Sequence, residues 1–225
     1  MACCSGCSRY SEAERQFGPD IAARDLERYR RKGPDATSRL LLKALRVYSN
    51  GAMSLLDIGG GVGVLDFELL ANGVGSATLV DASPAYLDAA GREAESRNMA
   101  ERLRCVAGDF AVLGKSIESA DIVTMHRVVC CYPDHASLLT AATTHARHVF
   151  ALSYPRDRWY VRLWVELENA RRRLFGNPFR TFVHAPDAIE ARITHSGFLR
   201  VHRSRTFVWS IDIYARKLKA QYQDR

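Results

Sequence analysis

The feature that most constrains this 225-residue chain is a cluster of glycines directly after a short apolar segment, residues 54–58. That segment is predicted to be a buried strand, and a helix is predicted to begin at Val64. The run over residues 57–63 reads Asp-Ile-Gly-Gly-Gly-Val-Gly. Glycine tolerates positive φ and lets a ligand approach the backbone without meeting a Cβ atom. In a doubly wound α/β sheet, such a loop is where a nucleotide-like ligand binds.

Strand-like and helical segments alternate along the chain. At this spacing they predict an α/β fold with a mostly parallel sheet that helices cover on both faces. The predicted strands lie at residues 54–58, 77–80, 103–107, 121–125 and 149–152, with two closing strands within 199–215. The predicted helices lie at residues 21–32, 35–48, 64–72, 83–97, 134–146, 158–174 and 185–197.

The glycine loop can be compared with two cofactor-binding patterns. A dinucleotide fold requires G-x-G-x-x-G or G-x-G-x-x-A, and this chain has Val64 at the last position. A third small residue there would let the helix and the strand pack closely, so the mismatch disfavours a dinucleotide. The alternative pattern D-x-G-x-G-x-G is met in full by Asp57, Gly59, Gly61 and Gly63.

This loop resembles motif I of the class I methyltransferases that depend on S-adenosylmethionine (SAM), and the resemblance continues in order over residues 52–153. Asp81 ends the second predicted strand, Asp109 follows the third, and residues 120–125 are similar to the family's fourth strand. The resemblance implies that Asp81 binds the ribose hydroxyls and that Asp109 accepts a hydrogen bond from the adenine amine. A carboxylate can accept from both hydroxyls of a diol, which gives Asp81 an independent chemical reason for that role.

The resemblance also implies the architecture and the cofactor chemistry. The expected fold is a doubly wound, Rossmann-like sheet of seven strands with an N-terminal helical cap and an antiparallel strand inserted beside the sixth. SAM is the expected methyl donor, S-adenosylhomocysteine (SAH) is the expected product, and no metal is expected. The expected cofactor-binding residues are Asp57, Gly59, Gly61, Gly63, Asp81, Ala82, Gly108, Asp109 and Phe110.

The substrate crevice is expected beyond the carboxyl ends of the central strands. His126 is the candidate general base because its ordinary pKa is near neutrality, although a loop hydrogen bond would equally explain it. Tyr154 and Arg156, after the fifth strand, are candidate catalytic residues. Candidate substrate contacts, which packing or ion pairing would also explain, are Arg127, Tyr132, Trp159, Tyr160 and His184.

The predicted organisation is a tail with cap helices over residues 1–50 and a SAM-binding domain over residues 51–217, with a substrate-covering insertion near residues 158–187. No apolar run is long enough to span a membrane and no secretory leader is apparent, so a cytoplasmic location is expected. The oligomeric state, monomer or homodimer, stays open. The tail holds Cys3, Cys4 and Cys7, an incomplete set of metal ligands that also leaves a thiophilic substrate as an alternative.

The sequence features are compatible with three functions. The first is methyl transfer from SAM to a small-molecule acceptor, with an aromatic and arginine-bearing pocket that favours an apolar acid. The second is a nucleic-acid methyltransferase, which the net charge of +7 allows, although no N/D-P-P-Y/F element follows the fourth strand and no nucleic-acid partner is expected. The third is a regulatory protein that binds SAM without turnover.

Overall fold

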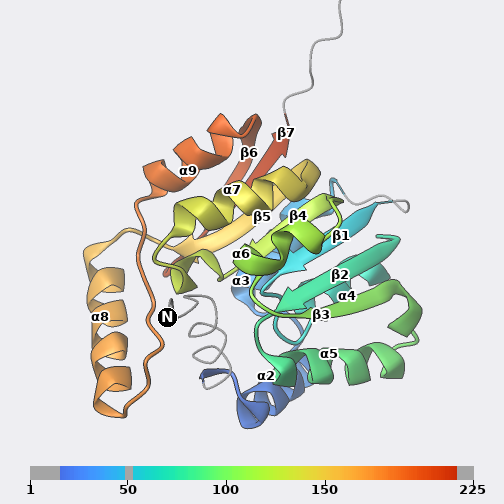
Figure 1. Cartoon of the computed structure of the whole chain (residues 1–225), viewed down its shortest axis with the longest axis horizontal. Helices are drawn as coiled ribbons and strands as arrows, with labels where there is room; N and C mark the ends of the chain where they lie inside the picture. The colour runs from blue at the N-terminus through green and yellow to red at the C-terminus, as the bar shows by residue number, and fades with distance from the viewer. Residues whose placement is uncertain (1–15, 49–52, 217–225) are drawn as a thin grey trace, which may run out of the picture.

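The computed structural model describes residues 16–48 and 53–216 as one sheet with helices packed around it (Figure 1). The predicted cysteine motif at Cys3, Cys4 and Cys7 lies outside the described residues. Seven strands form the sheet in the order β3-β2-β1-β4-β5-β7-β6. The strands are β1 (Ser54–Ile58), β2 (Ser76–Asp81), β3 (Leu103–Ala107), β4 (Ala120–His126), β5 (Ala146–Pro155), β6 (Phe198–Arg205) and β7 (Trp209–Arg216).

Strands β1 to β5 are parallel, and β7 runs antiparallel between β5 and β6. The sheet therefore has the predicted seven strands and the predicted antiparallel insertion. Its central strands are apolar on both faces, as parallel strands between two helical layers must be. In β1, for example, Leu55 packs into one hydrophobic layer and Leu56 packs into the other.

Helices cover both faces of the sheet. One layer contains α2 (Pro19–Lys32), α3 (Ala36–Leu45), α4 (Val64–Ala71) and α5 (Pro84–Ser96). The other contains α6 (Phe110–Leu113), α7 (His135–His145) and α9 (Pro186–His195). Short 3-10 turns occupy η1 (Ala100–Arg102), η2 (Gly114–Ser116) and η3 (Val129–Cys131).

The predicted N-terminal helices are present, and capping explains where α3 begins. The Asp35 carboxylate accepts hydrogen bonds from the backbone N–H groups of Thr37 and Ser38, both at 2.9 Å. Leu41 and Leu45 are fully buried, so α3 completes the helical layer over the β5 and β7 end of the sheet. The connection between α2 and α3 consequently reaches the carboxyl ends of the central strands.

Helix α8 (Trp159–Leu174) stands at the margin of the molecule, and an extended segment runs back along it towards α9 (Figure 1). We call this segment, residues 175–185, the strap. Asn169 of α8 binds Thr181 of the strap twice, because its side-chain amide donates to the Thr181 carbonyl and accepts from the Thr181 N–H. The Phe182 N–H donates to the Cys130 carbonyl at 2.7 Å, which fixes the strap to the loop after β4. Among the described helices, none has the length and apolar character needed to cross a membrane.

Candidate functional site

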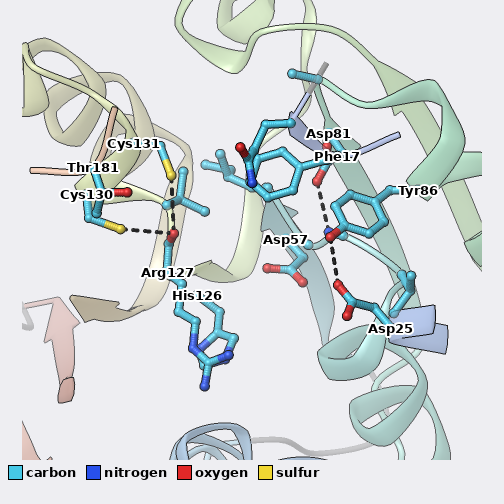
Figure 2. Close-up of a pocket in the computed structure, with 18 of the residues that line it drawn as sticks. Phe17, Asp25, Asp57, Asp81, Tyr86, His126, Arg127, Cys130, Cys131 and Thr181 are labelled. Carbon is cyan, nitrogen blue, oxygen red and sulfur yellow. Dashed lines mark hydrogen bonds between the residues drawn. The ribbon is translucent and has the colours of Figure 1, made fainter. Parts of the chain in front are cut away.

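A cavity of about 690 Å³ opens at the carboxyl ends of β1, β2, β4 and β5. The glycine loop and α2 form one side of it, whereas α8, the strap and the start of β7 form the other. Figure 2 shows this division: Asp57, Asp81 and Tyr86 lie on one side, with Arg127 and Cys130 across from them. We call the two parts the glycine-loop side and the arginine side.

The glycine loop is shaped so that its backbone faces the cavity. Gly61 has a φ of +61°, and a Cβ atom added there would meet nothing closer than the Tyr86 ring at 3.9 Å. Gly60 is enclosed instead, because an added Cβ would lie 2.4 Å from the Asp57 Oδ2 atom. The loop therefore presents bare backbone at Gly61, as close contact with a ligand requires.

Gly63 serves helix packing rather than the cavity wall. It occupies the N-cap position of α4 with a φ of +80°. An added Cβ would meet the Phe67 ring at 3.0 Å and Ala90 at 3.6 Å. Gly63 does not line the cavity, whereas Gly59 and Gly61 do. Its small size keeps α4 close to α5, so its place in the D-x-G-x-G-x-G pattern has a packing explanation.

Asp81 ends β2 beside the glycine loop. Its carboxylate accepts from the Gly61 N–H at 2.9 Å and from the Ser83 N–H at 2.8 Å. Burial raises the pKa of Asp81, and these backbone hydrogen bonds act in the opposite direction. Each carboxylate oxygen has a second lone pair, so both can still accept from a ligand. Ala82, the next residue, also lines the cavity.

Asp109 follows β3 and caps α6. Its Oδ1 atom accepts from the Ala111 N–H at 2.9 Å and from the Tyr132 hydroxyl. Gly108, with a φ of +142°, packs so closely on Leu113 that a Cβ would lie 2.4 Å from it. Phe110 is buried in the second hydrophobic layer but reaches the cavity wall. The four predicted residues after β3 and β4, Gly108, Asp109, Phe110 and Tyr132, thus line one cavity.

Two fully buried carboxyl groups lie beneath the glycine loop. Asp57 accepts a hydrogen bond from the Thr124 hydroxyl at 2.5 Å, and its Oδ2 atom has no donor among the described residues. Asp66 of α4 is equally buried. Burial raises the pKa of Asp57 to about 6, and burial together with the Asp57 charge raises the pKa of Asp66 well above its usual value. Burial thus makes both carboxyl groups harder to ionise than they are in water.

His126 ends β4 and is held by two hydroxyls. Its Nδ1 atom lies 2.8 Å from the Ser153 Oγ atom, and its Nε2 atom lies 3.1 Å from the Ser38 Oγ atom. Burial and the neighbouring Arg127 charge lower the pKa of His126 to about 3. His126 lines the cavity as predicted, but as a neutral imidazole it is a weak base.

Arg127 has a strained backbone, with a φ of +63°. Its guanidinium donates to the Asp35 carboxylate at 2.7 Å and lies over the Trp209 ring, 4.9 Å from the ring centroid. The buried Nε atom has no hydrogen-bond partner among the described residues. Asp35, Arg127 and Trp209 come from three distant parts of the sequence, and all three line the cavity.

Cys130 and Cys131 lie in η3 and also line the cavity. Both thiols donate to the Arg127 carbonyl oxygen, with Sγ–O distances of 3.3 Å and 3.6 Å (Figure 2). The contact with Cys130 and burial raise the pKa of Cys131 well above its usual value, so it is a neutral thiol. Among the described residues, no group of three or more His, Cys, Asp or Glu side chains is arranged to hold a metal ion.

Tyr154 and Arg156 lie outside the cavity lining. The Tyr154 hydroxyl is buried and donates to the Asp212 carboxylate at 2.7 Å. Arg156 donates to the carbonyl oxygens of Thr206 and Phe207 in the turn between β6 and β7. Both side chains are thus engaged with the antiparallel part of the sheet, which a reading of local sequence could not place beside β5.

Three predicted substrate contacts also lie outside the cavity lining. Trp159 is exposed on α8, and Tyr160 stacks on Phe207 with ring centroids 4.7 Å apart. His184 lies within hydrogen-bond distance of the Val129 and Tyr132 carbonyl oxygens, and burial lowers its pKa. Tyr160 binds the turn between β6 and β7 and His184 binds the loop after β4, whereas Trp159 faces solvent.

Several cavity residues were missed because the fold brings them from distant segments. Trp164 and Arg172 sit within α8, where the sequence pattern indicates only an amphipathic helix. Arg180 belongs to the strap, for which no element is predicted. An aromatic cluster on the glycine-loop side joins the N-terminal segment to the strap: Phe17 lies 5.6 Å from Tyr86 and 5.3 Å from Phe179 between ring centroids.

Comparison with known proteins agrees with this geometry. Residues 55–149 match the model of a family described as a methyltransferase domain. This match covers the glycine loop and the ends of β2, β3 and β4, where the cavity lies. A search of curated proteins found no match to the chain.

Solved structures share the fold at low sequence identity. Magnesium protoporphyrin IX methyltransferase from Synechocystis PCC 6803, with bound SAH, is 18% identical; the match covers 90% of this chain and 99% of that one, with a TM-score of 0.69. The CcbJ methyltransferase from Streptomyces caelestis is 18% identical over 82% of this chain and 91% of that one, with a TM-score of 0.60. An O-methyltransferase family 2 protein from Planctomyces limnophilus, in complex with apigenin, is 18% identical over 82% of this chain and 63% of that one, with a TM-score of 0.60.

The sheet order is that of the class I methyltransferase fold, and residues 55–149 match a methyltransferase domain. The Synechocystis enzyme that shares this fold has been solved with bound SAH and with bound SAM.

Proposed function

We propose that this enzyme transfers the methyl group of SAM to the carboxylate oxygen of a small, largely apolar acid. The observation that carries this proposal is a pair of arginines on the arginine side of the cavity. Arg172 is hydrogen-bonded to Asn169 and Thr181, and Arg180 to backbone carbonyl oxygens. Neither forms an ion pair with a carboxylate among the described residues, so both keep a charge to offer an anionic ligand.

The glycine-loop side would hold SAM. Bare backbone at Gly61 admits a ligand, Asp81 would accept hydrogen bonds from the ribose hydroxyls, and Asp109 would accept one from the adenine amine. SAM supplies a methyl group already activated by its sulfonium. The contribution of the chain is to hold the acceptor oxygen in line with that methyl and to exclude water.

A carboxylate acceptor also fits the shortage of bases in the cavity. His126 is the one histidine among the described lining residues, and its pKa of about 3 makes it a poor proton acceptor. A carboxylate is already ionised at neutral pH and needs no base. His126 would then be a positioning residue that orients the Ser38 and Ser153 hydroxyls at the ends of α3 and β5.

The size and lining of the cavity favour a small acceptor. A cavity of about 690 Å³ that also receives SAM leaves room for a small molecule rather than a polymer. Trp164, Trp209 and Phe182 give the arginine side apolar surfaces. The structurally similar proteins include enzymes whose names specify small molecules, magnesium protoporphyrin IX among them, which supports the same class of acceptor.

The proposal is tested by methyl transfer to a panel of aromatic and aliphatic carboxylic acids, with the matching alcohols and amines as comparison acceptors. Esters are the expected products, and the matching methyl esters should bind at least about tenfold more weakly than the free acids, because an ester has lost the negative charge. Equal affinity for acids and esters, or transfer confined to the alcohols and amines, would contradict the carboxylate assignment.

Variants separate the two sides of the cavity. Arg172→Gln and Arg180→Gln should each raise the KM for the acid about tenfold while SAM affinity, measured by calorimetry, stays unchanged. Asp81→Asn should weaken SAM binding by about tenfold to a hundredfold, because it loses charge-assisted hydrogen bonds. NADH serves as the control ligand: if the folded protein takes up NADH but neither SAM nor SAH, the cofactor assignment fails.

A further inference from the structure

The outward face of α8 carries a row of exposed apolar side chains, with the exposed Glu166 at its edge. Trp159, Leu163, Leu167 and Leu174 are exposed, and their spacing places them on one side of the helix. Phe175, directly after the helix, is exposed as well. The opposite side of α8 carries its buried residues and binds the strap. We call the five exposed side chains the α8 stripe.

This concentration is unusual for the molecule. Eleven large hydrophobic side chains are exposed in the described residues, and six of them fall within residues 159–175. Scattered exposed hydrophobics need no explanation, whereas a contiguous patch marks an interaction surface. Figure 1 shows α8 at the outer margin of the molecule, where its face can meet a flat partner.

Positive charge borders the α8 stripe. Residues 156–180 contain seven arginines against three acidic residues. By helical spacing, Arg162 and Arg173 flank the stripe on one side and Arg171 flanks it on the other. Arg162 is paired with Asp157 and Arg171 with Glu168, which leaves a positive excess along the segment.

We propose that α8 docks on an anionic lipid surface, with the stripe in the boundary between headgroups and acyl chains. Tryptophan, phenylalanine and leucine on one face, flanked by arginines, are the combination that such a surface binds. The arginines would contact the anionic headgroups, which supplies the charge complementarity that a second copy of this basic chain lacks. The helix lies on the bilayer and does not cross it.

Trp164 and Arg172, which line the cavity, project from other faces of the same helix. The stripe is therefore separate from the arginine side of the cavity. Vesicle binding is measured without acceptor or SAM, so its result is independent of the proposed carboxylate chemistry.

The test is flotation of the full chain with vesicles of phosphatidylcholine alone and of phosphatidylcholine mixed with phosphatidylglycerol. The chain should float with the mixed vesicles and about tenfold less with the neutral ones. Leu163→Ser combined with Leu167→Ser should lower binding to the mixed vesicles by about a hundredfold, since two buried leucines are lost. Arg173→Gln should lower it about threefold to tenfold.

A matched control uses two exposed apolar residues elsewhere. Leu199 and Val201 on β6 are 49% and 47% exposed, close to the 53% and 61% of Leu163 and Leu167. Leu199→Ser combined with Val201→Ser should leave vesicle binding unchanged. All four positions are solvent-exposed, and an unchanged thermal melt verifies that each variant is folded.

Three outcomes would overturn the proposal. The first is absence of flotation of the wild-type chain with the anionic vesicles. The second is an equal loss of binding in the α8 variant and the β6 control. The third is a dimer in sedimentation that the Leu163 and Leu167 substitutions convert to monomer while no vesicle binding is seen, because a second copy would then cover the stripe.

Discussion

At the scale of single residues, Tyr154 shows how a polar side chain beside an active cavity can serve the fold. Its hydroxyl and the Arg203 guanidinium both donate to Asp212, which is fully buried in β7. A buried carboxylate with these partners is satisfied, and loss of a partner leaves it short of a donor. Tyr154 thus stabilises the β5–β7 junction.

Tyr154→Phe should keep kcat/KM within about twofold of wild type and lower the free energy of unfolding by about 1 to 2 kcal/mol. Steady-state kinetics and urea denaturation measure the two effects. A large loss of kcat with an unchanged unfolding midpoint would instead assign Tyr154 to catalysis.

The buried Asp57 and Asp66 pair makes stability depend on pH with a defined sign. The pKa of Asp57 is about 6 in the folded protein, compared with its usual value of 3.8. At pH values between these two, the folded protein therefore binds more protons than the unfolded chain. The contribution of Asp57 to the free energy of unfolding is therefore present at low pH and is lost as the pH rises through about 6. His126 acts oppositely, since its lowered pKa costs stability as the pH falls below 6.5.

Asp66→Asn isolates the carboxyl pair. The free energy of unfolding of wild type, minus that of the variant, should fall as the pH rises from roughly 4 to 7, because the raised pKa of Asp66 makes its ionisation costly in the folded protein, whereas an amide does not titrate. Urea titrations at several pH values measure this difference. A difference that stays constant with pH would show that the pKa of Asp66 is not raised in the folded protein.

At the scale of elements, the strap depends on one side chain of α8. The Asn169 amide binds both backbone groups of Thr181 and also accepts from Arg172. Asn169→Ala should raise the acceptor KM about tenfold, because Arg172 and Arg180 lose their fixed positions, and should leave SAM affinity unchanged.

Asn72→Ala is the control for that substitution, since Asn72 makes one exposed side-chain hydrogen bond at the end of α4, to Glu68. Kinetics with varied acceptor and calorimetry with SAM give the two readouts. Parallel losses in both readouts for Asn169→Ala would indicate general unfolding rather than strap release.

Element positions were predictable because apolar periodicity and capping are local. The strand at residues 103–107 was predicted with its observed bounds, and the helices predicted to start at residues 35 and 83 are capped by Asp35 and Ser83. Strand β5 was predicted as residues 149–152 but spans Ala146–Pro155, because the exposed Arg147 and His148 interrupt its apolar pattern.

The glycine-loop side of the cavity was largely predictable, whereas on the arginine side Arg127 was predicted but Trp164, Arg172 and Arg180 were not. The glycine-loop side follows local motifs, whose residues come next to strand ends. The arginine side depends on tertiary contacts: Trp209 reaches Arg127 because β7 inserts beside β5, and no local pattern encodes that neighbour. Trp159 and Tyr160 were predicted as contacts from proximity to β5, yet α8 turns them away from the cavity.

At the scale of the whole molecule, ligand binding should couple to global stability because the cavity walls come from both ends of the chain. At a hundred times its Kd, SAH should stabilise the fold by about 2.7 kcal/mol and raise the melting temperature by roughly 5 to 10 °C. NADH at the same concentration should leave the melting temperature unchanged. Differential scanning fluorimetry measures both, and a shift with NADH alone would contradict the class.

The insertion of β7 between β5 and β6 has a consequence for biosynthesis. Among the described residues β7 is the last strand along the chain, and its register with β5 runs from Val149 opposite Ala215 to Pro155 opposite Trp209. While a ribosome is still translating residues 209–216, β5 has a bare hydrogen-bonding edge that another nascent chain could pair with. When β7 leaves the ribosome it pairs with that edge and places Trp209 beneath Arg127. The arginine side of the cavity is therefore completed only after β7 has been translated.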